Sequence, residues 1–139
     1  MGSAAAWDQR SFRQSQVAGY SRGLGAIRPL YNGLARLFGY PHLPPAGSYL
    51  DYCYLSLVCI KNNDPEILAA LLAELIGRNR SRFSFLMAGF HERDPLLKVL
   101  RRYPHFSYPS RLYVVSWEDG EADFQRLDGR TPYLELGAL

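Results

Sequence analysis

The clearest pattern in the chain is a pair of apolar segments, each followed by an amphipathic stretch that opens on Asp-Pro. Residues 49–60 (YLDYCYLSLVCI) and 83–90 (FSFLMAGF) are aromatic and aliphatic with few polar interruptions, which is typical of strands covered on both faces. The Asp-Pro pairs at 64–65 and 94–95 supply an N-cap and a first-turn proline. Two successive strand–helix units favour parallel pairing with a right-handed crossover, and we expect segment 49–60 to be central.

Helical periodicity follows both Asp-Pro pairs and also precedes the first apolar segment. Apolar side chains recur every three or four positions within 27–38, and Gly39 suits a left-handed stop. The second Asp-Pro pair predicts a helix over 96–103. The first predicts a helix that ends at Gly77 or continues to Arg80, with one apolar stripe made of Ile67, Leu68, Leu71, Leu72, Leu75 and Ile76.

The C-terminal part of the chain predicts two further strands. Residues 111–117 (RLYVVSW) and 132–139 (PYLELGAL) are separated by a polar, glycine-containing loop, which favours an antiparallel hairpin. Residues 7–21 have no decisive period, and the proline-rich segment 40–48 predicts a connector. The expected fold class is therefore α/β (α+β), with a mixed sheet, two parallel strand–helix units and a closing antiparallel hairpin.

Length and composition fit a single small domain. The chain has 139 residues, of which 47% are hydrophobic and 21% charged; this composition excludes a disordered chain. No apolar run reaches the ~18 residues that a membrane-spanning helix needs. We expect residues 1–48 to form a helical or irregular segment and connector, and 49–139 to form the α/β core. Because the opening Met-Gly-Ser is typical of an expression remnant, we expect a fragment of a longer protein.

Charge and cysteine content indicate the setting of the protein. Sixteen Lys and Arg against thirteen Asp and Glu leave a net charge of +3, which is too mild to indicate nucleic acid. Cys53 and Cys59 lie six residues apart, an even offset that predicts one strand face and a separation of about 20 Å. They are too far apart to pair. We expect two reduced thiols that act as small core hydrophobes, in a cytoplasmic protein.

The most polar cluster is the segment 91–94 (HERD), directly after the second apolar segment. Ligands of open α/β sheets bind beyond the carboxyl ends of strands, so His91 and Glu92 are candidate functional residues there. The N-cap role accounts for Asp94. A His beside a Glu lacks the spacing of metal ligands, so no metal site is expected. A serine hydrolase motif of the GxSxG type is also absent from the sequence.

Lys61, Asn62 and Asn63 occupy the matching position after the first apolar segment. A phosphate-binding helix start usually contains glycine, whereas Asp64 and Glu66 bring negative charge to this one. The segment therefore disfavours a strong pyrophosphate site. A third polar group interleaves tyrosines with arginines; nucleic acid could bind such a surface, but packing at a strand edge is the commoner use of tyrosine. Its members are Arg101, Arg102, Tyr103, Tyr108, Arg111 and Tyr113.

The order of elements and the segment DPLLKVLRRYPHF resemble the GNAT superfamily of N-acyltransferases, over residues 49–139 or about two thirds of the chain. In that superfamily a Q/R-x-x-G-x-G/A loop holds the acyl-CoA pyrophosphate, and an N-x-x-A-x-x-L-Y-x-x-x-G-F helix often supplies a tyrosine as general acid. Leu100 and Phe106 match the second motif. Its Asn, Ala, Tyr and Gly positions hold Asp94, Leu97, Arg101 and His105, and no glycine lies between Ile60 and Gly77.

The resemblance implies an acyl-CoA-dependent N-acyltransferase-like domain with degenerate cofactor and catalytic motifs. It implies acetyl-CoA or another acyl-CoA as cofactor, an amine as substrate, and a missing N-terminal domain or a second copy as partner. His91 and Glu92 are then the candidate bases and Tyr103 the candidate acid. The candidate cofactor-binding residues are Lys61, Asn62 and Asn63. The alternative is a non-catalytic interaction or dimerisation domain that uses an exposed sheet edge.

Overall fold

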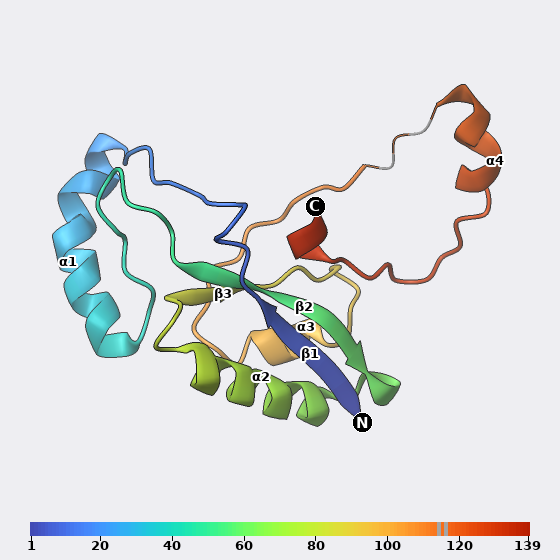
Figure 1. Cartoon of the computed structure of the whole chain (residues 1–139), viewed down its shortest axis with the longest axis horizontal. Coiled ribbons are helices and arrows are strands. Elements are labelled where there is room, and N and C mark those ends of the chain that lie inside the picture. Colours follow the sequence, from blue (N-terminus) through green and yellow to red (C-terminus); the bar gives the residue numbers. More distant parts are fainter. Residues whose placement is uncertain (114, 116) are drawn as a thin grey trace.

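A mixed sheet lies at the centre of the molecule (Figure 1). The computed structural model describes residues 1–113, 115 and 117–139. The sheet order is β1-β2-β3, with β1 antiparallel and β3 parallel to the central strand. The strands are β1 (Gly2–Trp7), β2 (Tyr52–Ile60) and β3 (Phe85–Met87). The expected mixed α/β sheet with a central first apolar segment is therefore confirmed.

The described part of the chain also contains four α-helices and three 3-10 turns. Figure 1 shows α2 and α3 beside the sheet, and α1 and α4 at opposite ends of the molecule. None of these helices is long and apolar enough to cross a bilayer. The helices are α1 (Arg22–Phe38), α2 (Pro65–Asn79), α3 (Leu97–Leu100) and α4 (Glu121–Phe124), and the turns are η1 (Lys61–Asn63), η2 (Glu118–Gly120) and η3 (Leu136–Ala138).

The first strand–helix unit forms as the sequence predicts. The carboxylate of Asp64 accepts a hydrogen bond from the Glu66 N–H at 2.9 Å, and Pro65 occupies the first turn of α2. This arrangement satisfies one of the free N–H groups at the helix start. After α2 the chain returns to pair Phe85 with Tyr52 in parallel, which confirms the crossover.

The second Asp-Pro pair produces less helix than predicted. Asp94 accepts a hydrogen bond from the Leu96 N–H at 2.8 Å, but α3 spans only Leu97–Leu100 instead of 96–103. A single turn has few internal hydrogen bonds, so burial of its apolar side chains must hold it in place. Val99 is fully buried.

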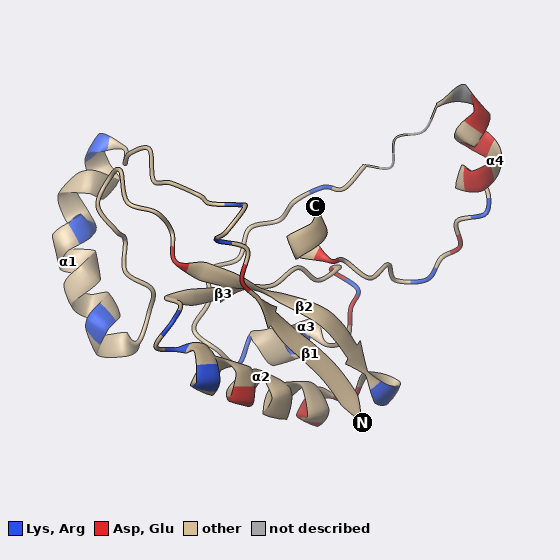
Figure 2. Ribbon diagram, viewed as in Figure 1, with Lys and Arg blue, Asp and Glu red and all other residues tan. Residues whose placement is uncertain are grey.

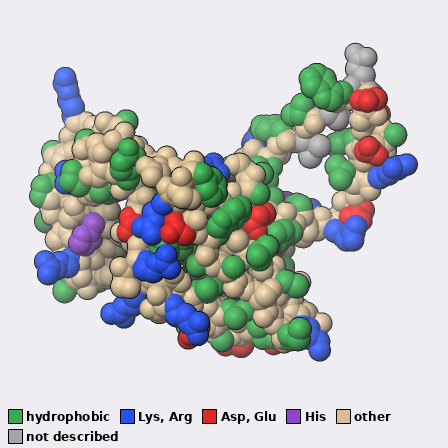
Figure 3. Space-filling model, viewed as in Figure 1, with side chains coloured by type: hydrophobic (Ala, Val, Ile, Leu, Met, Phe, Trp, Pro, Cys, Tyr) green, Lys and Arg blue, Asp and Glu red, His purple; other side chains and the backbone are tan. Residues whose placement is uncertain are grey.

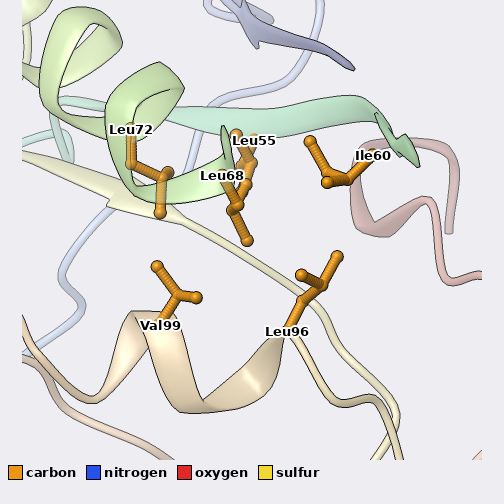
Figure 4. Packing of buried hydrophobic residues seen from close by; sticks show 6 residues of the cluster. All are labelled: Leu55, Ile60, Leu68, Leu72, Leu96 and Val99. Atoms are coloured by element: carbon orange, nitrogen blue, oxygen red, sulfur yellow. The ribbon is translucent and has the colours of Figure 1, made fainter. Parts of the chain in front are cut away.

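The core lies between the sheet and the two helices α2 and α3. Figure 4 shows side chains from β2, α2 and the α3 segment pointing toward one another. Burial of such side chains contributes about 1.5–3 kcal/mol each relative to exposure. The cluster consists of Leu55, Ile60, Leu68, Leu72, Leu96 and Val99.

Residues 2–7 form a strand for which the sequence pattern gives no signal. They pair with β2 from Gly2 opposite Ile60 to Trp7 opposite Tyr54. A Cβ atom at Gly2 would come within 2.8 Å of the Ile67 side chain, so glycine permits the close approach of this strand to α2. The small side chains of this Ala-rich segment suit a strand packed closely against a helix.

The register of β1 and β2 contains a β-bulge. Ser3 pairs with Cys59 but Ala5 pairs with Ser56, so β2 has one extra residue in this interval. Leu57 lies there with a φ of 55°, in the left-handed region that a non-glycine residue rarely adopts. The bulge reverses the alternation of side chains along the second half of β2.

The bulge overturns the prediction that both cysteines are core residues on one strand face. The extra residue turns the even offset into an effectively odd one, so the two thiols face opposite sides of the sheet. Cys53 is 2% exposed, whereas Cys59 is exposed. Burial raises the pKa of the Cys53 thiol to about 11, so this thiol stays protonated at neutral pH.

The predicted closing hairpin was wrong in the described residues. Residues 111–113 and 132–135 have no regular structure, and Leu136–Ala138 forms the turn η3. Positions 114 and 116 of the first predicted strand lie outside the described residues. The last segment instead reaches β2 through side chains, as shown below. Because no strand in the described part of the chain lies beside this segment to supply a ladder of backbone hydrogen bonds, its alternating apolar pattern does not become a strand.

Helix α1 packs against the proline-rich connector at one end of the molecule (Figure 1). Ser21 caps its start and Gly39 ends it with a φ of 71°, so the helix begins five residues before the predicted 27–38. The connector is bound by side chains of the helix, since Asn32 exchanges hydrogen bonds with the backbone of Leu43 at 2.8 and 2.9 Å.

Candidate functional site

A cavity opens where the two parallel strands separate. β2 and β3 pair only from Tyr52–Phe85 to Tyr54–Met87, while β2 continues to Ile60. The space beyond holds about 400 Å³ and lies at the carboxyl ends of the two strands, where the sequence predicts a ligand site. Its lining comes from Leu55, Val58, Ile60, Asn63, Gly89, Phe90, Asp94, Pro95, Leu96, Arg130, Thr131, Pro132, Tyr133 and Leu134.

The C-terminal segment forms one wall of this cavity and contacts the bulge directly. The Leu57 N–H donates to Oε2 of Glu135 at 2.9 Å. The Val58 N–H donates to the hydroxyl oxygen of Tyr133 at 3.2 Å. The Tyr133 hydroxyl in turn donates to Oε2 of Glu135 at 2.7 Å. The bulge therefore directs two successive N–H groups to one pair of side chains, in place of the next strand of the sheet.

These contacts set the protonation of the two side chains. Burial alone would raise the pKa of Glu135, but hydrogen bonds from the Leu57 N–H and the Tyr133 hydroxyl lower it overall. Burial, together with the bond to Glu135, raises the pKa of Tyr133. At neutral pH the pair is therefore a carboxylate beside a neutral phenol.

The last residues of the chain, 136–139, pack against β1 and the segment that follows it. Gln9 is 2% exposed, and its Nε2 donates to the carbonyl oxygen of Gly137 at 2.6 Å. A Cβ atom at Gly137 would lie 2.8 Å from the Trp7 ring, so no side chain fits there without displacement. Arg13 donates to the Leu139 carbonyl oxygen at 3.1 Å. Residues 136–139 are thus fixed independently of the bulge contacts.

The candidate bases follow β3, close to the cavity but outside its lining. Nδ1 of His91 accepts a hydrogen bond from the Arg93 N–H at 3.1 Å, and Glu92 is exposed. Asp94 does line the cavity, where its carboxylate also caps the turn before α3. The proposed roles of His91 and Glu92 remain predictions.

The other candidate residues divide between the cavity and the core. Lys61, Asn62 and Asn63 form η1, with φ angles of 56° at Asn62 and 49° at Asn63. Of the three, only Asn63 lines the cavity. Tyr103 packs against the core and donates to the Ala69 carbonyl oxygen at 3.3 Å. The structure therefore brings Asn63 and Asp94 to one cavity, with Tyr103 on the α2 side of the core.

No family model, curated protein or solved structure matches this chain. The functional assignment must therefore come from the geometry of the cavity and its walls.

Sequence reasoning did not identify Tyr133 and Glu135 as site residues. The sequence did indicate that the two side chains lie together, because Tyr133 and Glu135 are two positions apart in the predicted strand 132–139. Residues two apart on a strand share one face. Nothing in the sequence indicated that this face meets the bulge, because the bulge itself follows from the pairing of β1 with β2.

A second polar cluster lies near the start of β2 and consists of mutually paired charges. Arg10 bonds Asp8 at 2.9 Å and Asp51 at 2.7 Å, and Arg82 approaches Asp8 at 3.6 Å. The bonds from Arg10 lower the pKa of Asp8 to about 2. Figure 3 shows basic and acidic side chains lying side by side on the face in view. Since Arg10 also lies over the Phe83 ring, at 4.4 Å from its centroid, the cluster joins elements of the fold.

The described residues contain no group of three or more His, Cys, Asp or Glu side chains placed to hold a metal ion. The polar groups at the cavity are instead an amide, carboxylates, a phenol, a hydroxyl and one guanidinium. Such groups bind polar parts of organic ligands by hydrogen bonds and ion pairs.

Proposed function

We propose that this chain is an acyl-CoA-binding domain of the N-acyltransferase type, as the resemblance to the GNAT superfamily implies. The observation that carries the proposal is the separation of parallel β2 and β3 at their carboxyl ends, with a cavity between them. This is the position at which open sheets with strand–helix units bind ligands. The two strand–Asp-Pro–turn units that flank the cavity come from the segment that carries the resemblance.

The chemistry of the cavity supports an extended acyl-bearing ligand. Its lining includes the apolar residues Leu55, Val58 and Phe90, whereas Asn63 and Arg130 bring an amide and a cation. Its volume of about 400 Å³ falls in the range of small-molecule sites, about 300–1,000 Å³. An acyl group and the amide-containing arm that carries it would match this combination, whereas the Arg130 guanidinium is already paired with Asp128 at 2.6 Å.

In this proposal the domain binds the acyl-CoA, but its own residues catalyse acyl transfer only weakly. The carboxylate of Asp94 already accepts the Leu96 N–H, and Tyr133 is held by Glu135. Neither is placed as a free general base. A missing N-terminal domain or a second copy would have to complete catalysis, in line with the degenerate motifs of the sequence.

Isothermal titration with acetyl-CoA and longer acyl-CoAs tests the proposal. We expect measurable binding by the unmodified chain and at least about tenfold weaker binding by Val58→Phe, because a larger ring fills the cavity. Val115→Phe is the matched control, since Val115 is 89% exposed and lies outside the cavity. Thermal unfolding of both variants verifies that they are folded. No detectable heat at millimolar acyl-CoA for the unmodified chain would refute the proposal.

A second candidate function is self-association through α1. The helix turns a stripe of apolar side chains to solvent, each at least half exposed, and carries arginines but no acidic residue. Figure 2 shows this basic helix at one end of the molecule and the acidic α4 at the other. The stripe consists of Ile27, Leu30, Leu34, Leu37 and Phe38.

The occupant of this stripe would be the α4 region of a second copy. That region exposes Trp117, Phe124 and Leu127 beside the acidic residues Asp119 and Glu121. Apolar contacts rimmed by opposite charges are the complementarity that a protein interface requires. Two copies could exchange these contacts reciprocally, as in a two-fold dimer.

Sedimentation of charge-exchanged variants tests this candidate. We expect the unmodified chain to dimerise, whereas Arg22→Glu/Arg36→Glu alone and Asp119→Lys/Glu121→Lys alone should each be monomeric. A mixture of the two variants should recover a dimer, because the exchanged charges are again opposite. A monomer for the unmodified chain at high concentration, or no recovery in the mixture, would refute this mode of association.

A further inference from the structure

The bulge in β2 directs the N–H groups of Leu57 and Val58 to side chains of the C-terminal segment beside the cavity. Beyond Met87 the strand β3 has ended, so it cannot pair with Leu57 or Val58. Leu57 is 67% exposed, so water can accept hydrogen bonds from these N–H groups when no side chain does. Here Glu135 and Tyr133 act as the acceptors, and Tyr133 also lines the cavity. The site therefore contains an acceptor pair supplied by the chain itself.

We propose that residues 130–135 form an intramolecular latch that occupies this edge of β2 and is displaced when a ligand enters the cavity. The inference rests on the proposed function and adds the regulation of the same site. The ligand group that displaces the latch would be a second hydrogen-bond acceptor, such as an amide carbonyl or a carboxylate, because it replaces a carboxylate and a phenol oxygen on the same two N–H groups.

The latch can open while the last residues of the chain, 136–139, stay in place. Residues 136–139 are held separately by Gln9 and Arg13, while Leu136 packs where a Cβ of Gly89 would lie, at 3.0 Å. The latch itself is more loosely held, since Tyr133 is 56% exposed. A boundary at Glu135, where the chain enters η3 with an irregular φ of –89° and ψ of 86°, separates the moving part from the fixed part.

The Glu135 carboxylate is partly enclosed in the closed latch. Its Oε1 has no partner with hydrogen-bond geometry among the described residues, although the Ser56 hydroxyl and the Gly137 N–H lie near enough to lower the pKa of Glu135. Opening exposes this carboxylate to water, which offsets part of the cost of breaking the two contacts to the bulge.

The closed latch lowers the apparent affinity for ligand by a factor that depends on how often the latch is open. When the binding-competent state is only a fraction of the population, the apparent dissociation constant rises by the inverse of that fraction. Removing the latch acceptors should therefore tighten binding, whereas removing residues that contact the ligand should weaken it. The direction of the change separates a latch from a ligand-binding role for Tyr133 and Glu135.

Amide hydrogen exchange tests the latch in the full chain without any ligand. We expect the Leu57 and Val58 amides to exchange about tenfold faster in Tyr133→Phe/Glu135→Leu, because both acceptors are gone. Tyr133→Phe alone keeps the ring and should accelerate Val58 in particular. The matched control is Tyr113→Phe/Glu74→Leu, which makes the same changes at exposed positions without a hydrogen bond to the bulge. Unchanged exchange in the double variant would overturn the latch.

Titration with acetyl-CoA provides the second readout. We expect about tenfold tighter binding by the double variant than by the unmodified chain or the control. Weaker binding by the double variant would overturn the latch, because the two side chains would then serve the ligand. If no variant binds acetyl-CoA while exchange still accelerates, the proposed function fails and the contacts of the latch with the bulge stand. Thermal unfolding confirms that each variant is folded.

Discussion

Replacing Leu68 by alanine is expected to lower the free energy of unfolding by about 2–5 kcal/mol. Leu68 is 0% exposed and packs at the centre of the core between β2, α2 and α3. The substitution removes buried methyl groups and leaves a cavity that the short α3 cannot fill. Because small domains are stable by only about 5–15 kcal/mol, a large share of the total would be lost. Urea denaturation followed by circular dichroism measures the change.

Leu30→Ala is the matched control for this prediction. It makes the same substitution on a helix, but Leu30 is 69% exposed on α1. Its effect on the monomer should stay within about 0.5 kcal/mol. Equal destabilisation by the two substitutions would show that the core does not lie between α2 and β2.

The second large effect is expected at Gly137, which fixes the end of the chain. A Cβ atom there would lie 2.8 Å from the Trp7 ring and 3.0 Å from Nε2 of Gln9. We expect Gly137→Ala to displace η3 and to destabilise the protein by about 1–3 kcal/mol, as overpacking does. The emission of Trp7 should shift to the red as its ring is exposed, measured in a Trp117→Phe background.

Gly129→Ala controls for the change of glycine itself, because no atom lies within 4 Å of a Cβ at that position. It should leave both the emission and the urea midpoint unchanged. If Gly137→Ala behaved like this control, the packing of residues 136–139 against β1 would be refuted. The fixed end of the proposed latch would be refuted with it.

The parts of the fold that local sequence could predict are those with strong local signals. Asp64-Pro65 gave the start of α2, and Gly39 gave the end of α1, because capping and proline geometry act over one turn. The parallel crossover followed from the order strand, helix, strand. Each of these rules needs only a few neighbouring residues.

The predictions that were wrong depend on contacts between distant residues. The strand β1 forms because residues 2–7 meet β2, from 47 to 58 positions further along the chain, and the bulge at Leu57 arises within that pairing. The bulge then separates the environments of Cys53 and Cys59. The segment 132–139 has strand-like alternation but no strand to pair with, so it ends as η3.

The candidate site also has one part that the sequence could predict and one part that it could not. The place of the cavity follows from the rule on carboxyl ends of parallel strands. Asn63 and Asp94 lie in its lining, and the role of Asn63 in cofactor binding remains a prediction. The wall made by Tyr133 and Glu135 was not foreseen, because it requires both the bulge and the return of the chain end to β2. His91, Glu92 and Tyr103 were singled out by residue type, and their roles remain predictions.

The amino-acid sequence by itself determined the Asp64-Pro65 start of α2, the turn capped by Asp94, the buried central strand and the parallel crossover, because these follow from steric and hydrogen-bonding preferences of adjacent residues. Only the tertiary structure decided which backbone N–H groups of β2 are left without a strand partner and which side chains accept their hydrogen bonds. That outcome depends on the register between segments far apart in the chain, and a shift of one residue reverses the side chains of a whole strand.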